Sequence, residues 1–238
     1  MHGIDADDSG WLAVVSTPIG NLGDMTYRAV DILKQADIIA AEDTRRAMKL
    51  LNYFEIKAHL TSYHIHNEHQ KTAGLLERVQ QGQKVALLSD AGTPCIADPG
   101  YLLVRDAIAA GIEPMIVPGV SAITFAAVAS GLPLSEFIFG GFLPHKSGKR
   151  RTALKRLACD GQTVILYESP YRITKLLSEI VDELGGGSTT VRRYAVRLSG
   201  LDDAAFLEFG RALFRSPVKA HVDAFLTDAR QMLSGLPG

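Results

Sequence analysis

Residues 85–100 read VALLSDAGTPCIADPG, an apolar run followed by a loop with two prolines and two glycines. The run Val85–Ser89 is apolar on both faces, which is typical of a central strand in a parallel sheet. The loop is too rich in Pro and Gly for an ordinary connection. Glycine permits close approach of the backbone to a ligand, and proline limits the entropy lost on binding. The stretch therefore predicts an open parallel sheet with a ligand site at its carboxyl edge.

The same pattern occurs near the N-terminus, where the apolar run Trp11–Ser16 leads into STPIGNLG at 16–23. One such loop is as easily a tight turn as a ligand loop, but two in one sheet favour a ligand site. Neither loop is a GxGxxG or P-loop sequence, so the fingerprints of dinucleotide and triphosphate binding are absent.

Apolar runs alternate with amphipathic stretches along most of the chain, which predicts an α/β fold with helices on both faces of a mostly parallel sheet. We predict an N-terminal α/β domain over 1–141, a linker at 142–148 and a C-terminal α/β domain over 149–238. The predicted helices are Tyr27–Gln35, Thr44–Tyr53, Asn67–Gln81, Asp98–Ala110, Ser121–Ser130, Lys149–Leu157, Tyr171–Leu184, Ala204–Phe214 and Val218–Met232. The further predicted strands are Ile38–Ala41, Ile112–Val117, Phe137–Gly141, Thr163–Tyr167 and Val191–Val196.

Composition excludes several classes of protein. The two cysteines among 238 residues, Cys95 and Cys159, are far apart, so neither a disulfide framework nor a thiolate metal site is expected. The cluster His64, His66 and His69 has no cysteine ligands nearby, and we predict no metal there. The N-terminus lacks a signal pattern and no apolar run approaches the roughly 20 residues that span a bilayer, so a cytoplasmic location without membrane contact is expected.

Charge is the next clue. The formal net charge is −1, so affinity for RNA must come from a local patch. The run HKSGKRRTALKR at 145–156 holds six cations and no acid. Such a run is either a solvated helix face or a strip that binds phosphates, and the residues alone leave both open.

Three further segments at strand ends are candidates for a site. PGVSA at 118–122 opens a helix, and AEDTRR at 41–46 places two acids beside two arginines at the end of a strand. YESPYR at 167–172, in the second half of the chain, also carries an acid and an arginine where a strand leads into a helix. Each also has a plain structural explanation as a capped helix start with surface ion pairs.

Several segments together identify a family. STPIGNLGDMTYRAVDIL, AEDTRR, HIHNEHQK, LLSDAGTPCIADPGYLLVRDA, VPGVSA, GFLPHKSGKRRTAL and ESPYR occur in that order. The chain resembles the 16S ribosomal RNA 2′-O-ribose (cytidine) methyltransferase I family of the tetrapyrrole methylase superfamily, over roughly residues 11–184. The resemblance implies two α/β domains, S-adenosyl-L-methionine in the cleft between them, a homodimer, and 16S ribosomal RNA or the small ribosomal subunit as partner.

The resemblance also implies a set of site residues. The methyl donor is expected at Ser89, Asp90, Ala91, Gly92, Thr93, Ile96, Ser121, Ala122 and Tyr167. The substrate is expected at Pro18, Gly20, Glu42, Asp43, Arg45, Lys146, Arg150 and Arg151.

After Leu184 the chain departs from the family's pattern. The family usually carries an Arg-Glu-Leu-Thr-Lys motif and a Gly-Glu pair, where this chain has YAVRLSG at 194–200 and VKAHV at 218–222. We therefore expect a shortened or atypical C-terminal domain, with donor binding and weak or absent methylation of free RNA.

Transfer of a methyl group to a ribose hydroxyl calls for a base or a cation near the acceptor oxygen. Glu42, Asp43 and Glu168 are candidate bases, Arg45 and Arg172 are candidate stabilisers, and the sequence does not select among them. Two alternatives stay open: a methyltransferase for a tetrapyrrole or other small acceptor, and a donor-binding protein that has lost activity.

Overall fold

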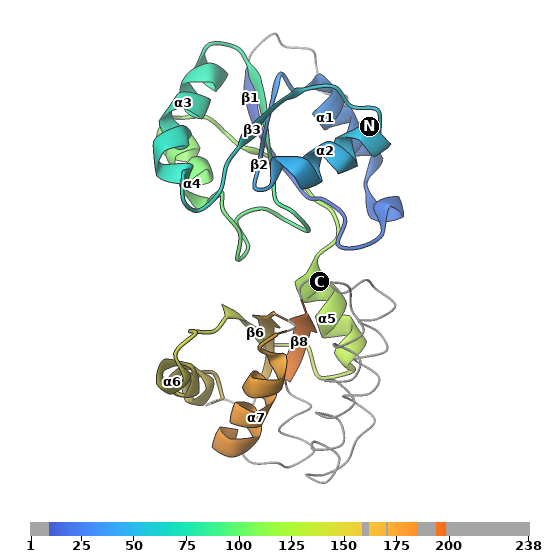
Figure 1. Cartoon of the computed structure of the whole chain (residues 1–238). Coiled ribbons are helices and arrows are strands. Elements are labelled where there is room, and N and C mark those ends of the chain that lie inside the picture. Colours follow the sequence, from blue (N-terminus) through green and yellow to red (C-terminus); the bar gives the residue numbers. More distant parts are fainter. Residues whose placement is uncertain (1–9, 159–161, 170, 185–193, 199–238) are drawn as a thin grey trace. The chain divides into compact units, whose positions relative to one another are not determined.

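The computed structural model describes residues 10–158, 162–169, 171–184 and, for the backbone alone, 194–198. The chain divides into two compact units, Met1–Ser121 and Ala122–Gly238, whose elements are labelled in Figure 1. This division falls earlier than the linker predicted at 142–148. That segment lies after β6 (Phe137–Phe142), and β6 pairs with β7 (Thr163–Glu168) inside the second unit, so a boundary there would cut a sheet.

The first unit is built on a five-stranded parallel sheet in the order β3-β2-β4-β1-β5. The strands are β1 (Trp11–Val15), β2 (Ile38–Ala41), β3 (His59–Ser62), β4 (Lys84–Leu88) and β5 (Met115–Val117). The helices are α1 (Tyr27–Gln35), α2 (Thr44–Tyr53), α3 (Glu68–Gln80) and α4 (Tyr101–Ala109), with a 3-10 turn η1 (Leu22–Asp24). The central position predicted for the apolar run after Lys84 is confirmed, because β4 lies between β2 and β1.

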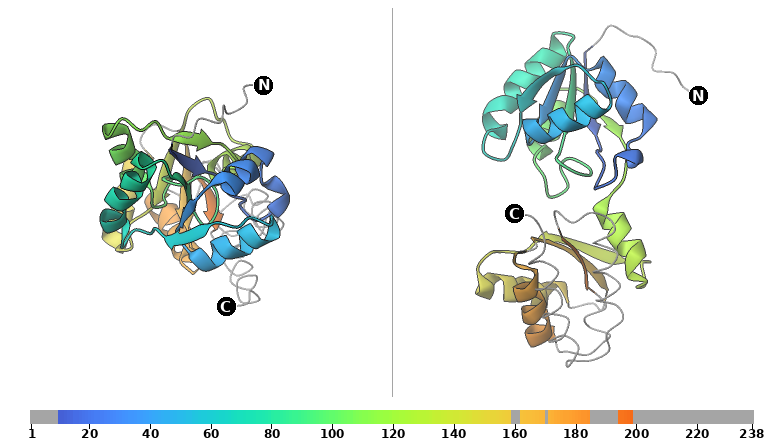
Figure 2. Two further views of the ribbon diagram at one scale, coloured as in Figure 1. Left: turned by 90° about the horizontal axis from the view of Figure 1, so that it is seen from above. Right: turned by 45° about the vertical axis from the view of Figure 1, so that its right-hand side comes forward.

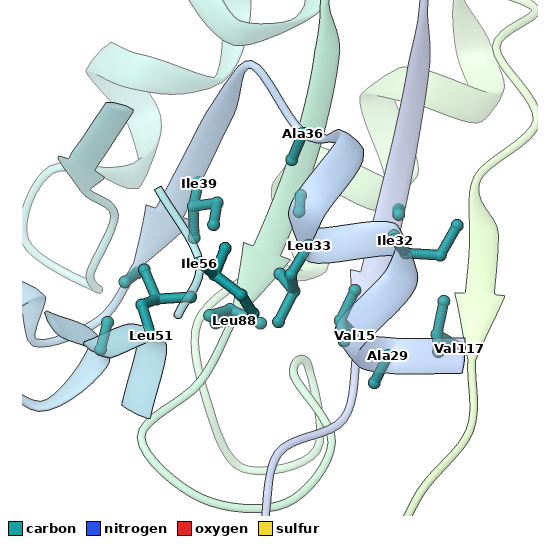
Figure 3. Close-up of a cluster of buried hydrophobic side chains, with 14 residues drawn as sticks. Val15, Ala29, Ile32, Leu33, Ala36, Ile39, Leu51, Ile56, Leu88 and Val117 are labelled. Carbon is teal, nitrogen blue, oxygen red and sulfur yellow. The ribbon is translucent and has the colours of Figure 1, made fainter. Parts of the chain in front are cut away.

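Helices cover both faces of this sheet, as the two views of Figure 2 show. On one face α1 and α2 pack through Ile32, Leu33 and Leu51 against the strands, in the cluster drawn in Figure 3. On the other face α3 and α4 pack through Leu76 and Leu103. The α/β fold predicted from the alternating pattern is confirmed.

In the described part of the second unit, three parallel strands pair in the order β6-β7-β8, where β8 covers Tyr194–Leu198. Helix α5 (Ala122–Ser130) packs against one face, through Ala126 and Ala127 on Ile165. Helices α6 (Ser147–Leu157) and α7 (Ile173–Leu184) cover the other face through Leu154 and Leu176. The strand predicted at Val191–Val196 overlaps β8 over Tyr194–Val196, and its first three residues lie outside the described part of the chain. The helices predicted at Ala204–Phe214 and Val218–Met232 lie outside the described residues.

Within the described residues, no helix is both long and apolar enough to cross a membrane.

Candidate functional site

Strands β1 and β4 are neighbours, and the connections that follow them lead toward opposite edges of the sheet. From β1 the chain runs through α1 to β2, and from β4 it runs through α4 and across β1 to β5. Helices α1 and α4 therefore lie on opposite faces of the sheet. In open parallel sheets a ligand crevice forms at such a point, outside the carboxyl ends of the strands. The loops 16–23 and 89–100 both begin there.

The two loops are joined to each other. The main chains of Thr17 and Gly92 form an isolated antiparallel bridge, with N–O distances of 2.8 and 3.1 Å. The Thr17 hydroxyl donates to the Ser89 carbonyl at 3.3 Å, and the hydroxyls of Ser16 and Thr93 lie 2.9 Å apart. These contacts fix the β4 loop against the β1 loop before any ligand binds.

The backbone of the loop 89–100 after β4 has a positive φ at four residues, two of which are not glycine. Gly92 and Gly100 have φ of +83° and +130°, and the non-glycine residues Cys95 and Ala97 have φ of +73° and +62°. A side chain at Gly100 would collide, because its Cβ would lie 2.7 Å from Leu87 and 2.8 Å from the Cys95 sulfur. Non-glycine residues at positive φ cost energy and concentrate at ligand sites, so this loop is the strongest candidate for a binding element.

The predicted donor-site residues divide between the two units. Six of them, from Ser89 to Ile96, belong to this one loop, where Ala91 and Ile96 are exposed and Ser89 is buried. Ser121 and Ala122 are the last residue of the first unit and the first of the second. Tyr167 lies at the end of β7, where its ring packs edge-on against Phe139 and Phe142. The pairing roles of Ser16 and Thr17 were missed, although the Ser-Thr-Pro sequence is part of the quoted loop.

The predicted substrate residues of the β1 loop differ in exposure. Pro18 is buried and Gly20 is exposed, with a φ of +152°. Gly20 is therefore accessible to solvent and to a substrate, whereas Pro18 is not.

In AEDTRR, Asp43 has a structural role. Its carboxylate caps α2 by accepting the Arg45 N–H at 2.8 Å, and it pairs with the Arg45 guanidinium at 2.9 Å. These bonds from Arg45 lower the pKa of Asp43 to about 2. The main-chain N–H of Asp43 also donates to the Asp90 carboxylate at 3.1 Å, and Arg46 pairs with Asp90 at 3.3 Å. The motif thus ties the end of β2 to the loop after β4.

Two other carboxyl groups at this edge of the sheet, those of Glu42 and Asp98, have pKa values above their ordinary values. Burial raises the pKa of Glu42, with a further rise from the charge of Asp90. Burial also raises the pKa of Asp98 to about 7, and the charge of Glu42 adds to that effect. Asp98 was treated above as the start of a helix. It lies instead in the loop before α4, at the same edge as Glu42 and Asp90.

The cations of 145–156 do not form an unpaired strip. Arg150 is 3% exposed and bonds to Glu179 of α7, with 2.7 Å between Nη2 and Oε1. Arg151 pairs with Asp182 and Glu183, and Lys155 also pairs with Glu183. The premise that these cations lack acidic neighbours is wrong, because the acids come from α7, which folds against α6. A buried Arg150 does not meet RNA at the surface. Lys146, Lys149 and Arg156 are exposed.

The end of β7 holds a second charged group. Glu168 is 1% exposed and pairs with Arg172, whose guanidinium also lies 2.6 Å from the His145 ring. The predicted stabiliser Arg172 thus pairs with Oε1 of the predicted base Glu168, whose Oε2 is buried without a hydrogen-bond partner in the described part of the chain. Within the described part of the chain, no group of three His, Cys, Asp or Glu side chains could hold a metal ion.

A family model described as Tetrapyrrole (Corrin/Porphyrin) Methylases matches residues 12–203. The chain belongs to this family. Among solved structures of similar fold, diphthine synthase matches with a TM-score of 0.58 at 16% identity, over 73% of this chain and 72% of that one. The methyltransferase CobJ matches with a TM-score of 0.57 at 23% identity, over 74% of this chain and 77% of that one. Both likenesses support the tetrapyrrole methylase fold and nothing finer.

More similar relatives of this tetrapyrrole methylase are named Ribosomal RNA small subunit methyltransferase I. The one from Halalkalibacterium halodurans is 47% identical over 187 residues, 79% of this chain and 65% of the relative. The one from Escherichia coli O157:H7 is 51% identical over 181 residues, 76% of this chain and 63% of the relative. The one from Micromonospora olivasterospora is 41% identical over 203 residues, 85% of this chain and 64% of the relative. The chain therefore spans less than two thirds of the length of each of these relatives.

Proposed function

We propose that this tetrapyrrole methylase transfers a methyl group from S-adenosyl-L-methionine to the ribosomal RNA of the small subunit, at the 2′-hydroxyl of a cytidine. The observation that carries the proposal is its 47% and 51% identity, over three quarters of its length, to relatives named Ribosomal RNA small subunit methyltransferase I. The cytidine 2′-hydroxyl is proposed from the resemblance of the sequence motifs. We further propose a homodimer in the cytoplasm.

The β4 loop is the proposed donor-binding element. Its strained backbone and its attachment to Thr17 give a rigid edge, and the exposed Ala91 and Ile96 flank the buried Gly92. A preorganised loop of this kind loses little entropy on binding a polar, charged small molecule. When bound, S-adenosyl-L-methionine supplies an electrophilic methyl group, so the protein's own task is to orient the acceptor and exclude water. Ser121, Ala122 and Tyr167 complete the proposed set.

We propose that the exposed cations Lys146, Lys149 and Arg156 bind RNA phosphates. This replaces the wider strip expected from sequence, because Arg150, Arg151 and Lys155 already face carboxylates. Arg45, whose side chain is 88% exposed, keeps its proposed place on the RNA-facing surface.

A methyl-transfer assay tests the proposal. Purified chain and methyl-labelled S-adenosyl-L-methionine are mixed with free 16S RNA, with small ribosomal subunits lacking the modification, or with no acceptor. We expect label in the RNA of assembled subunits and weak label in free RNA. Donor binding by calorimetry with no label in either RNA would favour a binding protein that has lost activity. Label in a small tetrapyrrole, offered as acceptor in a separate mixture, would favour the other alternative.

A further inference from the structure

Lys71 of α3 reaches the end of β3 and contacts hydroxyls there instead of an acid. Its ammonium donates to the Thr61 hydroxyl at 2.8 Å and to the Ser62 hydroxyl at 3.1 Å. Within the described part of the chain, no carboxylate pairs with this ammonium. Glu68, one turn earlier on α3, accepts the main-chain N–H of Gly100 instead, at 3.4 Å. Since an ammonium has three N–H donors, Lys71 keeps one unused donor and an uncompensated positive charge.

The Ser62 hydroxyl is also left with an unused donor. Its oxygen accepts a second hydrogen bond from the Asn67 amide nitrogen at 3.2 Å. The orientation of that amide follows from the main-chain N–H of His64, which requires the Asn67 oxygen opposite it, at 2.8 Å. A serine oxygen has two acceptor lone pairs, and Lys71 and Asn67 occupy both. The Ser62 O–H can therefore only donate, and no acceptor for it lies among the described residues.

The polar groups at the end of β3 are thus donors gathered around a positive charge. The oxygens of Thr61 and Ser62 both contact Lys71 Nζ, so one small ligand that contacts Nζ can reach all three groups. β3 is the outer strand of the sheet, and the three residues are partly exposed, so a ligand can approach them. A phosphate group matches such a set, because it offers several acceptor oxygens and a negative charge.

This cluster lies at the same edge of the sheet as the proposed donor loop. The parallel register aligns Ser62 of β3 with Ala41 of β2, and Ala41 with Leu88 of β4. Neighbouring strands are about 4.8 Å apart, so Ser62 is roughly 10 Å from the residue that precedes the loop 89–100. RNA carries a phosphate at every nucleotide, so a strand that presents a ribose to the loop can place another phosphate at the end of β3.

We propose that Lys71, Ser62 and Thr61 bind a phosphate group of the RNA substrate. The inference rests on the proposed function, and it assigns part of the RNA-binding surface to the first unit. Lys71 supplies the charge, and the two hydroxyls donate to phosphate oxygens. Asn67 is a positioning residue, because its amide leaves the Ser62 hydroxyl only the role of donor.

The first test is binding of 16S RNA by the whole chain across a salt series. Lys71→Met keeps the apolar stem and should weaken binding about tenfold, with the slope of log K against log salt reduced by about one unit. Ser62→Ala keeps every charge and should weaken binding about threefold at an unchanged slope. Lys34→Met, which removes an exposed cation from the last turn of α1, is the matched control and should keep the wild-type slope. Glu113→Gln, an exposed change that leaves every cation in place, should bind RNA and transfer methyl groups as wild type does.

The second test does not depend on methyl transfer. Lysines of the wild-type chain are acetylated in the presence and absence of 16S RNA, and the modified positions are measured by peptide mass spectrometry. RNA should suppress acetylation of Lys71 and leave Lys34 reactive. A parallel mixture contains inorganic phosphate at the same concentration of phosphate groups, and it should protect Lys71 less than RNA does.

Each outcome bears on a different claim. RNA binding with a protected Lys71 but no methyl transfer refutes the proposed function and supports the phosphate site. A wild-type slope in Lys71→Met, or equal acetylation of Lys71 with and without RNA, overturns the inference. Protection by inorganic phosphate and not by RNA assigns the site to a free anion and also overturns it. If Lys71→Met fails to fold, Lys71→Gln takes its place, since its amide can still donate to a hydroxyl, and the same loss of slope is required.

Discussion

The guanidinium of Arg150 and the carboxylate of Glu179 face each other inside the second unit, 2.7 Å apart and each 3% exposed. Arg150 also donates to the carbonyls of Pro144 and His145, and Ser147 donates to Glu179. This arrangement fixes the start of α6 against α7. A cation that looked suited to RNA binding is thus a structural residue.

Removing one partner of this pair should destabilise the chain strongly. Arg150→Met leaves a buried carboxylate without its cation and should cost about 3–5 kcal/mol of unfolding free energy. Arg151→Met breaks more exposed pairs and should cost at most about 1 kcal/mol. Urea unfolding of both variants measures the difference. Equal, small losses would show that Arg150 is not the buried anchor described here.

The same pair predicts a loss of stability in acid. The hydrogen bonds from Arg150 lower the pKa of Glu179 below its ordinary value of 4.5. Its contribution is therefore complete above that value and disappears as the pH falls through the lower pKa of the folded state. Glu179→Gln should unfold more easily than wild type at pH 7, with a gap that narrows below pH 4.5. A gap that does not change with pH would contradict the assignment.

A third prediction concerns three exposed cations, one just before α6 and two within it. Replacing Lys146, Lys149 and Arg156 with Ala should weaken RNA binding and reduce the slope of log K against log salt by about one unit per lost phosphate contact. The control is Lys34, Lys57 and Arg78, three exposed cations of the first unit whose removal changes the net charge equally. Filter binding across a salt series measures both. Equal slopes in the two triple variants would mean that α6 offers only a solvated face.

A fourth prediction concerns the donor loop. Gly92→Leu places a side chain at a φ of +83° beside Ile19 and should abolish binding of S-adenosyl-L-methionine. Gly111→Leu imposes similar backbone strain at a φ of +75°, in open space after α4. Calorimetry should therefore find donor binding in the second variant and not in the first. Binding by both would remove the loop from the donor site.

Asp98 provides a pH test of the same region. Between its ordinary pKa of 3.8 and its raised value of about 7, the folded chain holds a proton that the unfolded chain has lost. Asp98 therefore makes the stability fall as the pH rises through this window. Asp98→Asn should flatten that fall in urea unfolding, while Asp31→Asn, an exposed carboxyl of α1, should not. An unchanged slope in Asp98→Asn would place the carboxyl in water.

Much of the first unit follows from local sequence. Helices α1 and α2 begin after Thr26 and Asp43, whose side chains cap them, and their predicted bounds are confirmed. Strand β3 was missed because His59–Ser62 is a half-exposed edge strand without an apolar run, and its pairing with β2 defines it. Asn67, the first residue of the helix predicted at Asn67–Gln81, is the N-cap of α3, but it makes no capping bond because its side chain turns back to His64 and Ser62.

The site was harder to predict where partners are distant in sequence. A run of cations shows no acid near Arg150, since Glu179 lies 29 positions away on another helix. The raised pKa values of Asp98 and Glu42 come from burial and from carboxylates that follow two neighbouring strands, β2 and β4. By contrast, the loop from Ser89 to Gly100 could be predicted directly from its prolines and glycines. Two of those glycines, Gly92 and Gly100, have the positive φ that glycine favours.

The most direct test of the proposed methyltransferase is mass spectrometry of 16S ribosomal RNA nucleosides from a strain that lacks the gene. We predict the loss of one 2′-O-methylated cytidine, restored by the wild-type chain and by Glu113→Gln but not by Gly92→Leu. An identical set of modified nucleosides with and without the gene would contradict the account.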